Sequence, residues 1–181
     1  GGEVRPLTRV EVLTYTSMIA GAGNETTTRL IGFIGQLLAQ HPEHRRELVD
    51  DFSLIPRAIE EVLRYESPSP VQARHVAHDT EVHGQTIAEG SVMLLLNGSA
   101  NRDERHFPDG ESFDIHRTEP HLAFGQGLHF CLGSSLARMQ ARVALEELLT
   151  RWPEWQIDYD NAAMAHTSSV RGWGRLPVVT G

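Results

Sequence analysis

Apolar positions along the first part of the 181-residue chain recur at helical spacing. Thr8 and Glu11 form a T-x-x-E pattern, in which each side chain can bond the backbone of the other residue at a helix start. The helical pattern that follows continues to His41 and Pro42, where proline disfavours helical backbone in the residue before it. The sequence therefore predicts one helix of about 32 residues, or roughly 48 Å at 1.5 Å per residue.

The middle of this helix, AGAGNETTT at residues 20–28, has a poor helix composition. The bland explanation is that the small residues at 21–23 let another helix approach closely. Glu25 beside Thr26 weakens that explanation, because a carboxylate in an apolar stretch needs partners. A threonine hydroxyl can also bond the carbonyl one turn earlier and widen the helix where a small ligand could enter.

Two further helical patterns follow. Residues 41–51, HPEHRRELVDD, are strongly charged and predict a short helix with a solvated face that begins at Pro42. A third helix begins near Pro56 and stops at the break formed by Ser67 and Pro68. Its apolar stripe consists of Ile55, Ile59, Val62 and Leu63.

Glu61 and Arg64 lie three residues apart on the third helix, at neighbouring positions of its surface. On spacing alone they form an ordinary surface ion pair, which contributes about 0–1 kcal/mol. Only context elsewhere in the chain can give the pair a larger role.

Residues 71–96 change to short segments separated by the turn signals HG at 83–84 and EG at 89–90, and they predict a small β region. His75 and His78 do not predict a metal site, because a three-residue spacing on a strand sends side chains to opposite faces. The polar, glycine- and proline-containing residues that follow predict an irregular meander over 97–119 with at most a short helix. The tail predicts a β hairpin or two short strands at 170–179.

A glycine-rich loop, FGQGLHFCLG at residues 124–133, carries the only cysteine of the chain. Its three glycines let the backbone pass close to a flat ligand and adopt positive φ angles. We expect a core helix to start at Cys131 and to run to Trp152. The unpaired N–H groups at the start of that helix would stabilise Cys131 as a thiolate, the species that binds iron. The predicted buried stripe of that helix is Leu136, Val143, Ala144, Leu148 and Leu149.

Composition limits the class of protein. A hydrophobic content of 40% supports one globular unit. The helical and strand patterns above predict that it is mainly α-helical with small β-sheets, an α+β fold. The formal net charge of −8 argues against nucleic acid or an anionic membrane as the main partner. No apolar run approaches the roughly 20 residues of a membrane span, and no signal peptide pattern is present. A single cysteine cannot form an internal disulfide, which favours a reducing, cytoplasmic setting.

Three of these stretches together resemble the cytochrome P450 family, the haem-thiolate monooxygenases. FGQGLHFCLG matches that family's FGxGxHxCxG haem-binding signature at every fixed position. AGNETT at 22–27 resembles the oxygen-activating motif of the family's long central helix, and EVLR at 61–64 resembles its ExxR motif, with order and spacing in agreement. The later stretches similar to bacterial members are NRD, FDIHR and VRGWGRLPV.

The resemblance implies haem b as cofactor, with the Cys131 thiolate as axial ligand to the iron, the metal site of the chain. Phe124 then packs beside the porphyrin ring and the sulfur, while His129 and Arg74 bind the haem propionates through charge-assisted bonds. The remaining residues that this resemblance assigns to the cofactor site are Ala22, Gly23, Gly125 and Gly133.

The same resemblance assigns catalytic roles to Glu25 and Thr26, an acid and an alcohol that pass protons to dioxygen, the co-substrate. It implies a buried structural triad of Glu61, Arg64 and Arg117 that holds the meander and the loop beneath the haem. The positions where family members contact substrate are Val71, Gln72 and Ser169.

The implied reaction inserts one oxygen atom from dioxygen into a small organic substrate, with electrons from a ferredoxin or a flavoprotein reductase. Arg138 and Arg142 lie four apart on one helix and could meet an acidic donor, although a solvated helix face explains them equally. The family's catalytic domain is roughly twice as long as this chain, so residues 1–181 look like one partial domain, the C-terminal half, whose partner is the N-terminal half of the same fold.

Two alternatives stay open. In the first, the chain is a truncated, non-catalytic haem-binding fragment. In the second, it is a cysteine-nucleophile enzyme in which His129 or His121 activates Cys131. The nucleophile hypothesis gives no reason for the Glu25-Thr26 and Glu61-Arg64 patterns to accompany the glycine spacing.

Overall fold

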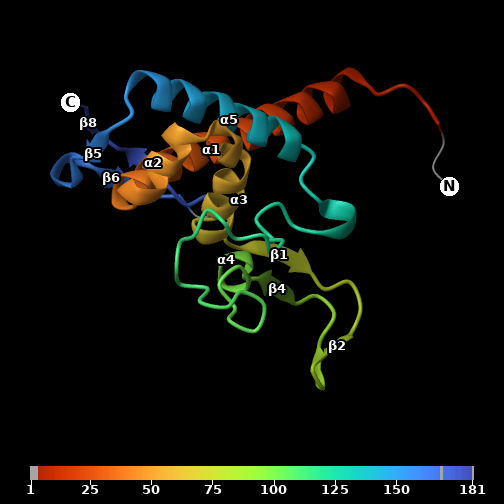
Figure 1. The fold of residues 1–181 in the computed structure, drawn as a ribbon. Coiled ribbons are helices and arrows are strands. Elements are labelled where there is room, and N and C mark those ends of the chain that lie inside the picture. Colours follow the sequence, from red (N-terminus) through yellow and green to blue (C-terminus); the bar gives the residue numbers. More distant parts are fainter. Residues whose placement is uncertain (1–3, 168, 181) are drawn as a thin grey trace.

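The computed structural model describes residues 4–167 and 169–180 and combines α-helices with small antiparallel sheets, the α+β class that the sequence predicts (Figure 1). The helices are α1 (Arg9–Gln40), α2 (Pro42–Asp50), α3 (Ile55–Tyr65), α4 (Asn97–Ala100) and α5 (Ser134–Arg151), with 3-10 turns at Phe52–Leu54, Gly127–His129 and Tyr159–Asn161. The strands are β1 (Gln72–His75), β2 (Thr80–Val82), β3 (Gln85–Ile87), β4 (Val92–Leu95), β5 (Trp155–Ile157), β6 (Ala163–Met164), β7 (Trp173–Arg175) and β8 (Val178–Thr180).

Helix α1 has the predicted length of 32 residues and the predicted capping box. The Thr8 backbone N–H donates to Glu11 Oε2 at 2.7 Å, and the Glu11 N–H donates to Thr8 Oγ1 at 3.3 Å. These two bonds satisfy backbone donors that the first helical turn leaves unpaired.

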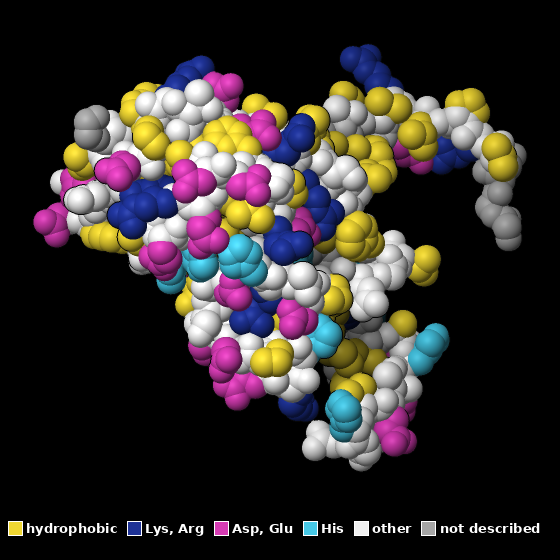
Figure 2. Space-filling view, in the orientation of Figure 1, with side chains coloured by type: hydrophobic (Ala, Val, Ile, Leu, Met, Phe, Trp, Pro, Cys, Tyr) yellow, Lys and Arg dark blue, Asp and Glu magenta, His cyan; other side chains and the backbone are white. Residues whose placement is uncertain are grey.

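The two halves of α1 have opposite environments. In the C-terminal half, Leu30, Phe33 and Leu37 are each 1% exposed and form the centre of the core with α3 and α5. The N-terminal half extends beyond the rest of the molecule, and hydrophobic side chains lie along it (Figures 1 and 2). The exposed apolar side chains there are Val10, Val12, Leu13, Tyr15, Met18 and Ile19.

Helix α5 differs from the prediction in its first residue and in its buried side. It begins at Ser134, with Gly133 at its N-cap, so Cys131 lies three residues before the helix instead of starting it. Of the predicted buried stripe, only Leu149 is fully buried, while Leu136 and Val143 are about half exposed. The buried side is instead Ser134, Ala141, Leu145 and Leu149. Helix α5 carries apolar residues on more than one side, and contact with α1 and α3 decides which side is covered.

The four sheets are two-stranded and antiparallel, pairing β1 with β4, β2 with β3, β5 with β8 and β6 with β7. The predicted HG turn joins β2 to β3, and both of its residues have positive φ, His83 at 50° and Gly84 at 76°. That geometry matches the twist of a two-residue hairpin. The tail forms the second of the two predicted arrangements, because β7 and β8 pair with other strands and not with each other.

The predicted meander contains one short helix, α4, followed by turns. Asn101, 0% exposed, joins three segments at its centre. Its side-chain amide donates to Ser67 Oγ at 2.9 Å, and its Oδ1 accepts from the Leu122 backbone N–H at 2.7 Å. The asparagine thereby ties the end of α3 to the chain just before the glycine-rich loop.

Candidate cofactor-binding site

The glycine-rich loop folds back on itself around Phe124. The Cys131 backbone N–H donates to the Phe124 carbonyl at 2.9 Å, and the Phe130 N–H donates to the Gly127 carbonyl at 3.0 Å. Gly125 and Gly127 have φ angles of 70° and 73°, the left-handed region that a Cβ disfavours. Two of the three glycines therefore have the conformation that the sequence predicts.

The loop exposes the Cys131 thiol together with apolar side chains. Leu128, Phe130 and Leu132 are 103%, 50% and 80% exposed, so the loop that carries the one thiol of the chain also presents apolar side chains. A cofactor that fits this surface is flat, largely apolar and bound through a metal that accepts a thiolate. Haem has these properties, and the residues present fit it.

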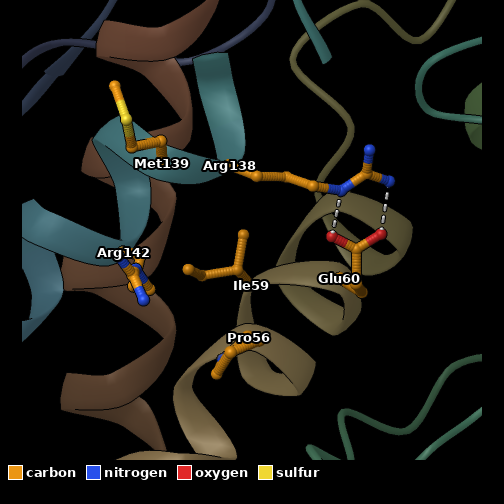
Figure 3. Close-up of a pocket in the computed structure, with 6 residues that line it drawn as sticks. All are labelled: Pro56, Ile59, Glu60, Arg138, Met139 and Arg142. Atoms are coloured by element: carbon orange, nitrogen blue, oxygen red, sulfur yellow. Dashed lines mark hydrogen bonds and ion pairs between the residues drawn. The ribbon is translucent and has the colours of Figure 1, made fainter. Parts of the chain in front are cut away.

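Phe124 is held by Arg138 of α5, which is itself bound to Glu60 of α3. The Arg138 guanidinium lies 4.5 Å from the centre of the Phe124 ring. It donates two hydrogen bonds of 2.7 Å to the Glu60 carboxylate (Figure 3). His121 Nε2 lies 3.2 Å from the same carboxylate. Burial alone would raise the pKa of Glu60, but the interactions of Arg138 and His121 outweigh it and lower the pKa to about 2.

This Glu60–Arg138–Phe124 network, which includes His121, was not foreseen as a support. The sequence suggests either a docking residue for an electron donor or a solvated helix face for Arg138, and the structure pairs it with Glu60. Arg142, considered with it, lies 3.8 Å from Glu146 on its own helix. No local spacing links Glu60 to Arg138, because 78 residues separate them. Glu60, Arg138 and Arg142 also line a surface pocket with Pro56, Ile59 and Met139 (Figure 3).

Glu61 and Arg64 form a buried pair, not the surface pair that their spacing alone predicts. Both side chains are 1% exposed, and the guanidinium donates two hydrogen bonds of 2.7 Å to the carboxylate. Arg64 is buried because its three other N–H groups also have acceptors. These are the backbone carbonyls of Asn101, Gly110 and Ser112, at 2.8–2.9 Å.

Arg117 joins this pair, as the family resemblance implies. Its Nε lies 3.7 Å from Glu61 Oε1, which also accepts the Asp114 backbone N–H at 2.9 Å. Arg117 donates in turn to the carbonyls of Pro108 and Asp109. The three charged residues together bind the meander at several backbone positions.

In the middle of α1, Thr26 makes the predicted bond to the preceding turn, with its hydroxyl donating to the Ala22 carbonyl at 2.8 Å. Glu25 is not buried, since its side chain is 42% exposed, and its partner is Arg29 at 3.2 Å. Arg29 also donates to the Trp173 carbonyl and so connects α1 to β7.

Close helix packing does not explain the small residues of this stretch. A Cβ placed on Gly21 or Gly23 would meet no atom within 4 Å in the described part of the chain. In this structure, Gly21 and Gly23 leave open space beside α1 and contact no neighbouring helix among the described residues.

The other predicted site residues remain separate side chains. Arg74 and His129 are exposed, and Arg74 bonds only the adjacent Ala73 carbonyl among the residues described. Val71 is 37% exposed, and the Gln72 amide donates to Ser69 Oγ at 2.6 Å. Ser169 is exposed at a bend.

The cysteine-nucleophile alternative finds no support in the geometry. Over residues 4–167 and 169–180, no hydrogen bond joins the Cys131 sulfur to a histidine, and the His121 ring nitrogen faces Glu60. A general base must lie within hydrogen-bond reach of the group that it activates.

Several known bacterial proteins are similar to this chain. Cytochrome P450 123 of Mycobacterium tuberculosis is 45% identical over 93% of this chain and 42% of its own length. The 6-deoxyerythronolide B hydroxylase of Saccharopolyspora erythraea is 39% identical over 93% of this chain and 42% of its own length. The chain thus spans about two fifths of the length of the curated relatives it matches.

A solved structure, the hydroxylase HmtN of himastatin biosynthesis, is 40% identical to this chain and superposes with a TM-score of 0.95. The superposition covers 99% of this chain and 50% of HmtN. None of the helices in the described segments is long and apolar enough to cross a membrane.

The sequence profile of the cytochrome P450 family matches residues 47–163, which include α3, the meander, the glycine-rich loop and α5. The profile match covers more than half of the chain. The chain therefore belongs to the cytochrome P450 family.

Proposed function

We propose that this chain forms the haem-binding, C-terminal part of a haem-thiolate monooxygenase that hydroxylates a small organic substrate. The observation that carries the proposal is the exposed Cys131 thiol on a loop whose Phe124 is held by Arg138, next to the meander that the buried Glu61–Arg64 pair binds. Bound haem would supply the activation of dioxygen, which a thiolate axial ligand favours.

The residues of the loop face have distinct roles in this proposal. The Cys131 sulfur would hold the iron. Phe124, fixed by Arg138, packs beside the ring, and the glycine conformations keep the backbone close to it. Exposed Arg74 and His129 would pair with the haem propionates, because a cation or a ring N–H facing a carboxylate makes a charge-assisted bond.

On α1, Thr26 Oγ1 holds a proton that it delivers toward the reacting oxygen. The Glu25 side chain, which is 42% exposed, takes up a proton from solvent and passes it on to Thr26 Oγ1. The space beside Ala22 and Gly23 admits the small co-substrate. The Arg29 contact keeps the Glu25 side chain on the side of α1 that carries β7.

Substrate and electrons come from outside the described site. Val71, Gln72 and Ser169 contact the substrate in this proposal, and a ferredoxin or a flavoprotein reductase supplies the electrons. Turnover requires an N-terminal half that covers the exposed apolar side of α1. A thiolate that must stay reduced suits the cytoplasm.

The ligand assignment is tested optically. The chain is loaded with haem, reduced and exposed to carbon monoxide, and we expect the strongly red-shifted Soret band of a thiolate-ligated haem. Cys131→Ser should lose that band, whereas Ser135→Ala, an exposed serine on the first turn of α5, should keep it. A red-shifted band in Cys131→Ser, or no haem uptake by the wild-type chain, would contradict the proposal.

A second candidate is a fragment that binds haem without turnover, which the exposed N-terminal half of α1 favours. The two candidates differ in product formation. Hydroxylation by the chain with an N-terminal half, but none by the chain alone, supports the partial-domain proposal. Hydroxylation in neither form supports the non-catalytic fragment.

The proton-delivery role is tested by Thr26→Ala in the catalytic domain that contains this chain. Thr28 is a matched control, because its hydroxyl also donates to a carbonyl one turn earlier, that of Asn24, at 2.8 Å. We expect Thr26→Ala to divert electrons to peroxide with haem binding intact, and Thr28→Ala to leave coupling unchanged. Equal coupling in the two variants would argue against Thr26.

A further inference from the structure

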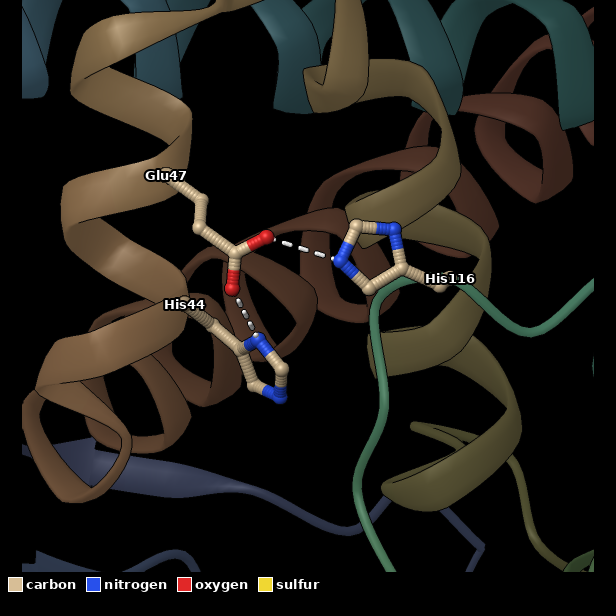
Figure 4. A group of neighbouring side chains, drawn as sticks. All are labelled: His44, Glu47 and His116. Atoms are coloured by element: carbon tan, nitrogen blue, oxygen red, sulfur yellow. Dashed lines mark hydrogen bonds and ion pairs between the residues drawn. The ribbon is translucent and has the colours of Figure 1, made fainter.

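A second group of metal-ligating side chains lies outside the loop site and consists of His44, Glu47 and His116 (Figure 4). His44 and Glu47 come from α2, and His116 comes from the meander, 69 residues after Glu47. The Glu47 carboxylate lies between the two rings, with Oε1 3.1 Å from His44 Nδ1 and Oε2 2.7 Å from His116 Nε2.

The His44 ring is held by packing, whereas the His116 side chain is 47% exposed. The side chain of His44 is 15% exposed, and its ring lies edge-on to the buried Phe113 ring, with centres 5.8 Å apart. The His116 ring centre is 6.1 Å from that of His44. Hydrogen bonds from His116 and His44 lower the pKa of Glu47, so the carboxylate carries its charge at neutral pH.

The arrangement matches what a zinc ion needs. Two imidazole nitrogens and one carboxylate oxygen are a common zinc ligand set, with a fourth position for water. Bonds of about 2.0–2.2 Å to a tetrahedral ion place the ligand atoms roughly 3.3 Å apart. The three ligand atoms already lie within 4.8 Å of one another, so a small rotation of the side chains brings them to bonding distance.

We propose that His44, Glu47 and His116 bind one Zn²⁺ ion. Each imidazole binds as the neutral form, with the nitrogen that now faces Glu47 turned to the metal and its proton carried by the other ring nitrogen. No haem or substrate takes part, so the proposal stands apart from the function proposed above.

The ion would join α2 to the segment that braces the loop. The His116 backbone N–H donates to Asp114 Oδ1 at 2.9 Å, and the Asp114 N–H donates to Glu61 Oε1 at 2.9 Å. Arg117, the residue after His116, pairs with the Glu61 carboxylate. Zinc at His116 therefore stabilises the meander beside the buried Glu61–Arg64 pair.

The test titrates the metal-stripped chain with Zn²⁺ alone at about pH 7.5, above the ordinary imidazole pKa of about 6.5. Bound zinc is counted by equilibrium dialysis. His116→Ala and Glu47→Gln should each lose one zinc equivalent or at least tenfold in affinity. His78→Ala, which removes an exposed histidine away from the cluster, should bind as the wild type does. Exposed Cys131 adds the same background to every variant.

A second readout keeps the test independent of how each variant folds. Because zinc stabilises only the form that binds it, the thermal midpoint of the wild type and of His78→Ala should rise with zinc concentration. The midpoints of His116→Ala and Glu47→Gln should not rise with it. Unchanged zinc stoichiometry in the two cluster variants, or the same zinc-dependent rise in all four proteins, would overturn the proposal.

Discussion

Glu60 and Glu61 are consecutive residues on α3, and each accepts two hydrogen bonds of 2.7 Å from one arginine. Their geometries are alike, but their environments differ. The Glu61–Arg64 side chains are each 1% exposed, whereas the Glu60–Arg138 side chains are 37% and 38% exposed. The pairs support neighbouring parts of one site, the meander and the Phe124 end of the loop.

The difference in burial teaches that similar contact distances carry very different energies. Removing one member of a buried pair leaves an uncompensated charge without water, while a half-exposed pair is screened and regains hydration. We therefore expect the Glu61 pair to control folding and the Glu60 pair to adjust the position of Phe124.

The largest expected effect is that of Arg64→Ala. It leaves the buried Glu61 charge and three backbone carbonyls without their donor, which costs about 3–5 kcal/mol of unfolding free energy. Arg57→Ala, on the exposed side of the same helix, should change it by less than about 0.5 kcal/mol. Chemical denaturation measures both. Equal losses of unfolding free energy for Arg64→Ala and Arg57→Ala would contradict the large contribution expected of the buried Glu61–Arg64 pair.

A smaller effect is expected for Arg138→Ala. It removes a screened ion pair and a cation–π contact with Phe124, which together contribute about 1–2 kcal/mol. The loss should be partly recovered in the Arg138→Ala, Glu60→Gln double variant, since no lone carboxylate remains. A double-mutant cycle by urea denaturation measures the coupling, and strict additivity would show that the pair does not interact.

The Glu60 pair should also depend on pH. Its carboxyl has a pKa lowered to about 2 in the folded chain from an ordinary 4.5. A lowered folded pKa stabilises the protein above pH 4.5, and this stabilisation is lost as pH falls from there toward 2. Since the side chain is more than a third exposed, the effect is about 1 kcal/mol.

The check compares wild type and Glu60→Gln by urea denaturation between neutral pH and the acid limit of folding. Their difference in stability should shrink as pH falls. Glu104→Gln, at an exposed position with no ion pair in the described chain, should show no such trend. A difference that is constant with pH would contradict the lowered pKa.

The smallest effect on stability is expected for Cys131→Ser. The thiol is exposed, and its residue is held through the backbone bond to Phe124, which serine keeps. We expect a change within about 0.5 kcal/mol by denaturation, although the variant should lose its red-shifted band. A loss of several kcal/mol would mean that the thiol itself holds the loop.

Some expectations depended on local chemistry and were confirmed. The capping box of Thr8 and Glu11, the turn at HG and the Thr26 bond to Ala22 involve residues within four positions of each other. Their partners are set by short-range geometry, which the order of residues reveals. The start of α5 was placed three residues early, because helix ends depend on the turn that precedes them.

Contacts between distant segments were harder to foresee. Nothing near Glu60 points to Arg138, and nothing near Glu47 points to His116. The buried side of α5 was misplaced for the same reason, since a helix with apolar residues on several sides can bury any of them.

By itself, the sequence determined the α+β class, the length of α1 and the motifs by which the chain resembles its family, because each depends on neighbouring residues. Only the tertiary structure decided that Glu61 and Arg64 are buried, that Glu60 and Arg138 support Phe124, and that His116 meets α2. The physical reason is that burial and long-range pairing arise when distant segments pack, and the energy of a charge depends on the water which that packing leaves around it.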